Sequence, residues 1–423
     1  MLSRKSFFFS VGFLLMSSLA IGQTARSPFS SYGIGEQYGT ALAPNQGMGG
    51  VGYSNPQYLY INNQNPALLV YNSLTTFQAG LIGEKRTQHS DSVTEKSGNG
   101  NLNFLAISFP VKSGWWTTSF TLMPYSRLNY QLKYITPVSG TSANSVDVIE
   151  EGSGGVNQLA WSNGVSISKS ISVGLKAAYL FSSIVSQYSN LLVNTQVPIS
   201  ARVSDRTYIS DFQFTPGVHI HLDSLGKKKY RFNIGLVYDL KTNLNAKFNQ
   251  RVERWNPARL LDSVTVIANQ GGTITVPANI MFGLSFSKPP YKWMAAVDAS
   301  YADYSKYRDL AGKNPYKSNN WRIAGGFEFT PDRASLGSYL KRITYRTGVS
   351  LENYPFLVNG NAVKDFGITF GLSLPVNRIS SLDFAFKWGK KGDRNLNTIE
   401  EDYFKIYFGL TFNDQWFIKR RFD

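Results

Sequence analysis

Residues 403–412 read YFKIYFGLTF, and this stretch decides the fold. Every second residue from Phe404 to Phe412 is apolar, whereas Lys405 and Thr411 are among the residues between them. Because successive side chains of a β-strand point to opposite faces, the segment has one apolar face and one mixed face. This pattern is typical of a transmembrane β-strand, whose outer face contacts lipid and whose inner face contacts the lumen.

The same alternation recurs along the chain, most clearly at residues 366–374, 382–388 and 232–240. We count 14 such segments, an even number as expected for a single-chain bacterial barrel. They lie at residues 74–86, 101–111, 115–134, 155–168, 171–188, 203–222, 229–248, 277–287, 292–304, 320–330, 342–352, 365–375, 381–390 and 402–412. The predicted fold is all-β, a transmembrane antiparallel β-barrel of about 14 strands.

The connections between these segments alternate in length. Short ones, such as residues 110–114 and 168–170, are followed by longer ones. The longer connections are 87–100, 135–154, 189–202, 249–276, 305–319, 353–364 and 391–401. Barrels of the outer membrane have short periplasmic turns and long external loops, so we expect the short turns to face the periplasm. Residues 330–341 are long for such a turn, and we expect a short helix there.

The N-terminus predicts export. Arg4 and Lys5 precede an almost wholly apolar stretch at residues 7–22, which reads as a signal peptide (residues 1–22) cleaved before Gln23. The alternative, a membrane anchor, is disfavoured because the stretch is short and lacks a basic stop-transfer flank. The chain has no cysteine, which excludes a lipoprotein, thiol catalysis and thiolate metal sites. We therefore expect an outer-membrane location.

Residues 23–72 differ from the remainder, residues 73–423, which form the predicted barrel. They lack a long period-two pattern and are rich in Gly, Asn, Pro, Ser and Tyr. Gly49 and Gly50 permit conformations and close contacts that other residues do not, and Pro66 fixes a turn beside Asn65 and Ala67. We expect a compact N-terminal segment, either a movable hatch or a static plug.

The formal charge of +16 suggests either nucleic acid or anionic lipid as a partner. The basic residues are spread over strand ends and turns and form no helix or arm. This distribution favours a rim that attracts outer-membrane lipid or lipopolysaccharide, and no nucleic acid is expected.

Candidate sites for chemistry are few. His219, His221 and Asp223 share a strand face, but a solvated or lumenal pair of histidines is a simpler interpretation than a metal site. Asp147 and Glu150–Glu151 are expected in an outer loop, as a solvated acidic cluster. No hydrolase, metalloprotease or phosphate-loop motif is present. We expect no catalysis, metal or cofactor.

At this point the chain resembles the FadL-type outer-membrane transport proteins, in the branch seen in Bacteroidetes. The likeness is carried by Gly47–Gly50, Asn65–Ala67, Gly154–Asn157, Ser172–Leu175 and the ending at Phe412–Phe417. It implies a barrel with an N-terminal hatch that includes Gly49, Gly50, Asn65, Pro66 and Ala67. It also implies passage of a small hydrophobic compound, such as a long-chain fatty acid, with sideways release through a kinked strand. The sequence does not identify that strand or the pocket residues.

The same branch includes PorV-like proteins, accessory subunits of the type IX secretion machinery. They imply an alternative function, namely a barrel that transports nothing and binds other outer-membrane or periplasmic proteins.

Overall fold

The structure is a computed structural model that describes residues 25–91, 93–137, 145–192, 200–225, 230–256, 259–288 and 292–415. The expected signal peptide lies outside these ranges. The elements are η1 (Pro28–Ser31), β1 (Glu36–Gln37), α2 (Ala43–Gln46), η2 (Pro66–Tyr71), β2 (Thr75–His89), β3 (Thr94–Lys112), β4 (Trp116–Pro137), β5 (Ser145–Ser166), β6 (Ile171–Leu192), β7 (Ser200–Leu225), β8 (Tyr230–Asp239), β9 (Thr242–Trp255), β10 (Leu260–Val276), β11 (Asn279–Lys288), β12 (Trp293–Ala302), η3 (Tyr304–Lys306), β13 (Asn320–Phe329), α3 (Tyr339–Arg342), β14 (Thr344–Val358), β15 (Asn361–Pro375), β16 (Ser381–Gly392), α4 (Arg394–Asn397) and β17 (Glu400–Asp414).

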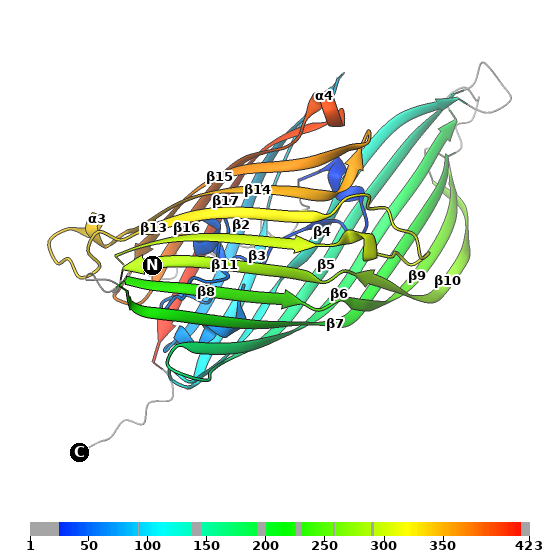
Figure 1. Cartoon of the computed structure of the whole chain (residues 1–423). Helices are drawn as coiled ribbons and strands as arrows, with labels where there is room; N and C mark the ends of the chain where they lie inside the picture. The colour runs from blue at the N-terminus through cyan, green and yellow to red at the C-terminus, as the bar shows by residue number, and fades with distance from the viewer. Residues whose placement is uncertain are drawn as a thin grey trace, which may run out of the picture.

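The strands β2–β17 form one closed antiparallel barrel (Figure 1). The last strand closes it, because β17 pairs with β2 from Glu400↔His89 to Asp414↔Thr75. β8 and β9 are two halves of one kinked strand, since both pair with β7, and β10 and β11 are likewise halves of the next strand. The barrel therefore has 14 strands, which confirms the predicted fold class.

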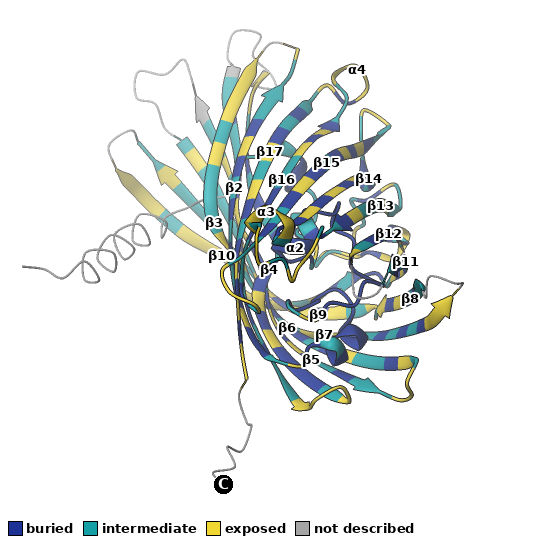
Figure 2. Cartoon of the chain, turned by 90° about the vertical axis from the view of Figure 1, so that its left-hand side faces the viewer, coloured by how far each residue is buried: buried dark blue, intermediate teal, exposed yellow. Residues whose placement is uncertain are grey.

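The alternation of the sequence corresponds to the two faces of the wall (Figure 2). Outward side chains are apolar and exposed, for example Phe370 at 60% and Trp388 at 56%. Their inward neighbours are polar and buried, for example Thr369 and Asp383, each 1% exposed. An apolar outer band around a closed barrel is the arrangement that a membrane-spanning barrel requires.

Several predicted outer loops were wrong, because the strands continue through them. Residues 249–276 form most of the β9–β10 hairpin, and Asp147 and Glu150–Glu151 lie in β5. In that strand the hydroxyl of Tyr130 donates to Glu150 across the β4–β5 pair, at 3.4 Å. These extensions lack a continuous apolar face, so the alternation that marks the rest of the wall is missing there. The expected short helix in residues 330–341 is present as α3.

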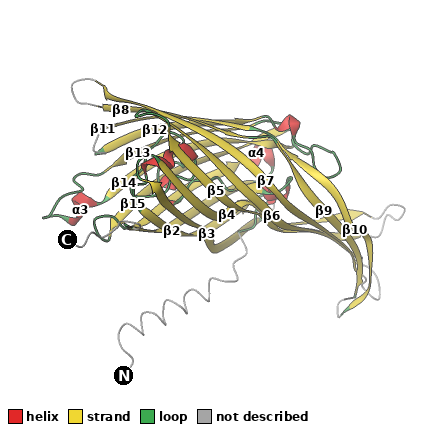
Figure 3. Ribbon diagram, turned by 90° about the horizontal axis from the view of Figure 1, so that it is seen from below, coloured by secondary structure: helices red, strands yellow, loops and turns green. Residues whose placement is uncertain are grey.

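The N-terminal segment, residues 25–72, lies against the inner faces of the strands and carries the short helices seen inside the barrel in Figure 3. Several of its apolar side chains are fully enclosed: Leu42, Met48, Ile61 and Leu68 are each 0% exposed. Among the described residues, no helix is long and apolar enough to cross a membrane.

The wall has a seam between β3 and β4. These strands pair only from Leu105↔Leu122 to Lys112↔Trp116. Beyond that point β3 continues to Thr94 along β2, and β4 continues to Pro137 along β5, and the described residues of β3 and β4 do not pair with each other there. One stretch of wall is therefore not closed by strand-to-strand hydrogen bonds.

Candidate functional site

Rows of paired glycines on the wall make room for the backbone of the N-terminal segment. Gly164 pairs with Gly174, which pairs with Gly217, across β5, β6 and β7. A Cβ on Gly174 would stand 2.4 Å from backbone atoms of Pro66 and Ala67, closer than atoms can approach. A second row, Gly326 paired with Gly348, receives Met48 in the same way. Any side chain in these rows would displace the segment.

The predicted residues Gly49 and Gly50 lie at the second row. Both adopt left-handed conformations, with φ of +71° and +76°, that favour glycine. The amide of Gly49 donates to the Thr369 hydroxyl at 2.7 Å, and its carbonyl accepts from Arg322. The two glycines thus fix a tight turn against β13–β15.

The predicted residues Asn65, Pro66 and Ala67 lie at the first row. The Asn65 side chain accepts from the amide of Ala67 at 3.0 Å and caps η2. Its amide group donates to the carbonyl of Val218 on β7 at 3.1 Å. The structure therefore brings the two predicted motifs to opposite sides of the N-terminal segment, each held by a glycine row.

The first part of the segment acts as a substitute strand at the β3–β4 seam. β1 pairs with β4 at Glu36↔Arg127, and the amide of Ser27 donates to the carbonyl of Asn129 at 2.9 Å. The Ser126 hydroxyl donates to the carbonyl of Ile34 at 2.6 Å. These bonds occupy the edge of β4 that β3 leaves open.

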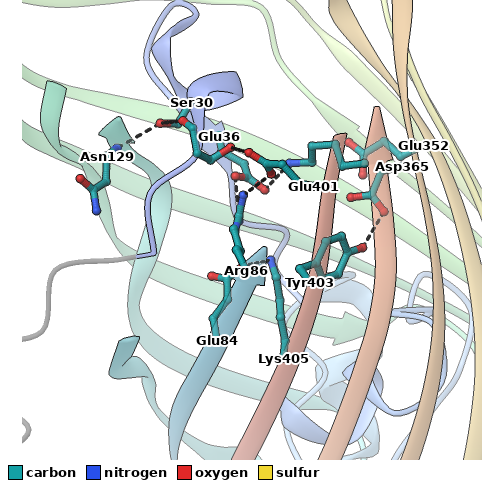
Figure 4. A network of polar contacts seen from close by, with 12 residues as sticks. Ser30, Glu36, Glu84, Arg86, Asn129, Glu352, Asp365, Glu401, Tyr403 and Lys405 are labelled. Atoms are coloured by element: carbon teal, nitrogen blue, oxygen red, sulfur yellow. Dashed lines mark hydrogen bonds and ion pairs between the residues drawn. The ribbon is translucent and has the colours of Figure 1, made fainter. Parts of the chain in front are cut away.

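A buried ion cluster holds this part of the segment to β2, β16 and β17, on the other side of the seam from β4 (Figure 4). Glu36 accepts from Arg86 of β2 at 3.0 Å and from Lys391 of β16 at 2.6 Å. Arg86 also binds Glu84 at 2.5 Å and Glu401 at 2.8 Å. The cluster is balanced, because three carboxylates face Arg86, Lys391 and Lys405.

Burial alone would raise the pKa of Glu36, but the nearby cations outweigh it. Arg86, Lys391 and Lys405 hold the pKa of Glu36 well below its usual 4.5. The carboxylate is therefore ionised at neutral pH, and its ion pairs with Arg86 and Lys391 are formed. We call these two ion pairs the latch.

An apolar cavity of about 440 Å³ lies on the other side of the same segment. Ile34 of the N-terminal segment and Ile184, Phe248 and Ile274 of the wall line it. The connection between β12 and β13 also folds inward and covers it through Leu310. Glu36–Gln37 at the seam follow Gly33–Ile34 at the cavity with only Gly35 between them, so one short stretch of chain contacts both the cavity and the seam.

A second, polar cavity of about 180 Å³ lies at the centre of the barrel. Its lining includes Glu352, Asp365, Lys387 and Lys405. Charged groups of this kind hold water, so an apolar molecule gains nothing by entering here.

The structure brings the two predicted histidines together, and both contact the same tyrosine. The Tyr71 hydroxyl lies 2.9 Å from Nδ1 of His221 and 3.4 Å from Nδ1 of His219. Within the described ranges no group of three potential metal ligands is assembled. The pair anchors the end of η2 to β7.

Sequence reasoning missed the ion cluster. Glu84, Arg86 and Glu401 are inward-facing charges in or beside predicted strands, so their positions were a usable signal. Their contact depends on the β17–β2 closure, which pairs Glu401 with Gln88 and which no local pattern specifies.

Comparison with solved structures shows the fold of the FadL-type barrels. The Pseudomonas putida toluene transporter TodX matches with a TM-score of 0.56 and 15% identity, over 90% of this chain and 99% of that one. A Pseudomonas aeruginosa FadL homologue gives 0.55 and 11%, over 89% and 98%. The Ralstonia pickettii toluene transporter TbuX gives 0.52 and 12%, over 89% and 98%.

No curated protein matches the chain. A family model does: the model described as BamG matches residues 2–423. With that match spanning nearly the whole sequence, the chain belongs to the BamG family.

Proposed function

We propose that the chain is an outer-membrane barrel that takes up a small hydrophobic compound and releases it sideways into the membrane. The observation that carries the proposal is the placement of residues 33–37 between an apolar cavity and an incompletely paired seam. Displacement of these residues would join the cavity and the seam. An apolar molecule that reached the seam would partition into lipid without crossing the charged centre of the barrel.

The N-terminal segment then has two roles. The part that contains Gly49, Gly50, Asn65, Pro66 and Ala67 closes the lumen and stays fixed, because its backbone fits the glycine rows. The part around β1 is the gate. Strand pairing, ion pairs and the packing of Phe29, Tyr32 and Ile34 against the wall hold it.

The cavity favours an uncharged compound over a fatty acid. Among the described residues that line it none is basic, and Asp309 contributes a carboxylate. A fatty carboxylate would find no cation there and would lie near a like charge. An aromatic or aliphatic hydrocarbon has neither disadvantage.

Binding of toluene to the purified barrel tests the proposal. Ile274→Trp fills part of the cavity and should weaken binding at least about tenfold, a loss of roughly 1.4 kcal/mol. Val264→Trp, on the same strand but 61% exposed, is the matched control and should bind normally. Equal binding by both variants, or no binding by the native chain, would overturn the proposed transport.

A second candidate function is a protein-binding accessory barrel, and one feature favours it. The β9–β10 hairpin extends past the end of β12, the next strand of the wall, and it exposes apolar side chains. Val264 is 61% exposed, Val266 56% and Leu261 41%. Exposed apolar groups beyond the membrane mark contact sites for other proteins.

Purification in mild detergent followed by mass spectrometry tests this alternative. A specific partner should be retained by the native chain and lost from Val264→Asp/Val266→Asp. Thr265→Asp, which changes the intervening residue, should retain it. If the native chain elutes alone, the hairpin binds no stable partner.

A further inference from the structure

The longest turn at the short-turn end of the barrel is built as a rigid projection. Residues 331–343 make up all but the first residue of the connection between β13 and β14, include α3, and extend past the strand ends (Figure 1). The amide of Asp332 donates to the carbonyl of Lys341 at 2.8 Å and closes the loop on itself. The Tyr339 hydroxyl donates to the carbonyl of Pro375 at 3.1 Å, which ties the loop to the neighbouring turn. We call residues 331–343 the α3 loop.

The α3 loop presents large apolar side chains outside the barrel. Leu336 is 96% exposed, Leu340 65% and Tyr339 44%. Val376, in the turn to which Tyr339 is bonded, is 66% exposed. Exposing this much leucine surface to water is unfavourable in free energy, so we expect this surface to contact an apolar environment.

An aromatic row places the membrane boundary beside the loop. Tyr230, Phe286, Trp293 and Phe327 lie near the strand ends on the outward face, with successive ring centroids 4.9, 5.8 and 6.3 Å apart. Such a girdle marks the level of the lipid headgroups.

The α3 loop is held on the lipid-facing side of the wall, close to that boundary. Tyr345 alternates with the buried Thr344 and Arg346, so its ring faces outward. Its hydroxyl donates to the carbonyl of Leu340 at 3.1 Å. Leu340 is therefore fixed next to a lipid-facing residue at the headgroup level.

The charges around the loop have one predominant sign. The described residues of the α3 loop and its two neighbouring turns carry one carboxylate, Asp332, and six cations. The cations are Lys288, Lys292, Arg333, Lys341, Arg342 and Arg378. Basic side chains at this level bind lipid phosphates while their stems lie along the apolar region.

We propose that the α3 loop is an interfacial anchor for phospholipid of the adjoining leaflet. Leu336, Tyr339 and Leu340 insert among the acyl chains, and Lys341 and Arg378 bind headgroup phosphates. The anchor fixes the depth of the barrel at this end, whether or not the barrel transports anything. Its features are those of monotopic anchors, namely an apolar group flanked by basic residues.

The cysteine-free chain allows a direct depth measurement. We would place a single cysteine at Leu336 or Leu340, attach a bimane fluorophore, and reconstitute the barrel in nanodiscs of phosphatidylethanolamine and phosphatidylglycerol. Lipids brominated near the headgroup should quench both labels at least about twofold more than a label at Lys169→Cys. Lys169 is an exposed residue of the β5–β6 turn at the same end. Quenching equal to this control would place the leucines in water and overturn the anchor.

A second measurement tests the phosphate contacts. Lys341→Glu/Arg378→Glu should retain at least about twofold less phosphatidylglycerol through purification than the native barrel. Lys313→Glu, at the opposite end, should retain the native amount. Unchanged lipid content in the double variant would overturn the assignment of these cations, even if the leucines are quenched.

Discussion

The sharpest test of the gate is Glu36→Gln. This change removes one charge and keeps the size of the side chain. Glu36 accepts from Arg86 at 3.0 Å and from Lys391 at 2.6 Å, and its side chain is 10% exposed. The glutamine leaves Lys391, which is 1% exposed, without its carboxylate partner. Arg86 keeps Glu84 and Glu401, so only part of the cluster is lost.

The cost follows from the burial. Removing one partner of a buried ion pair typically costs about 3–5 kcal/mol, and we take the lower end because Arg86 remains paired. Since each 1.4 kcal/mol corresponds to a factor of ten, the population in which β1 is released from the wall should rise roughly a hundredfold. The barrel itself should stay folded, because the cluster is not part of its strand pairing.

Thiol labelling measures that population. Ser30 is 3% exposed and lies in the same part of the segment, so Ser30→Cys should react slowly in the native background. Adding Glu36→Gln should raise the rate roughly a hundredfold. The matched control is Glu400→Gln, which breaks the more exposed pair with Lys390 and should change the rate less than about fivefold. Equal rates in the two double variants would refute a latch at Glu36.

Three further predictions concern the same segment. Gly174→Val should destabilise the barrel by about 1–3 kcal/mol in urea unfolding, whereas Gly83→Val, where a Cβ meets nothing within 4 Å, should be nearly neutral. Thr369→Val removes the hydroxyl that accepts from Gly49 and should cost about 1–3 kcal/mol in the same assay. Because the folded pKa of Glu36 lies well below 4.5, the latch is at full strength above about pH 5 and weakens as the pH falls through the folded pKa. The Ser30→Cys label, read with a pyridyl disulfide that reacts in acid, should therefore speed up only below about pH 4.5; a rise between pH 5 and 8 would contradict this.

The fold was predictable where one physical rule dominates. A lipid-facing strand must be apolar at every second residue, so a strand such as residues 365–375 can be identified from the sequence. The structure has β15 there, at Asn361–Pro375. This alternation is required only within the membrane, because side chains beyond it do not contact lipid. Residues 249–276 continue as β9 and β10 without an apolar outer face, and the sequence there reads as a loop.

The site was predictable only in part. Gly49–Gly50 and Asn65–Ala67 stand out because their types imply turns and close contacts, and the structure uses them so. Their partners, such as Gly174 and Gly348, lie in strands and have no local mark that separates them from other wall glycines. The seam depends on where β3 stops pairing with β4, which is a property of register and twist.

The two halves of the N-terminal segment differ in the balance of forces that hold them, and in the proposed function this decides which half moves. Residues 45–72 contact the wall through backbone atoms that pack against glycines. Moving these residues away would leave voids beside Pro66 and Met48. Residues 27–38 are held by strand bonds to β4, by the ion pairs of Glu36 and by apolar packing of Phe29, Tyr32 and Ile34. Of these, the strand bonds and ion pairs can be replaced by water, acid or a competing strand. In the proposed function, residues 33–37 contact both the apolar cavity and the β3–β4 seam, so a gate formed by them needs no unplugging of the barrel. The polar centre can then stay closed to water and ions while the lateral path opens.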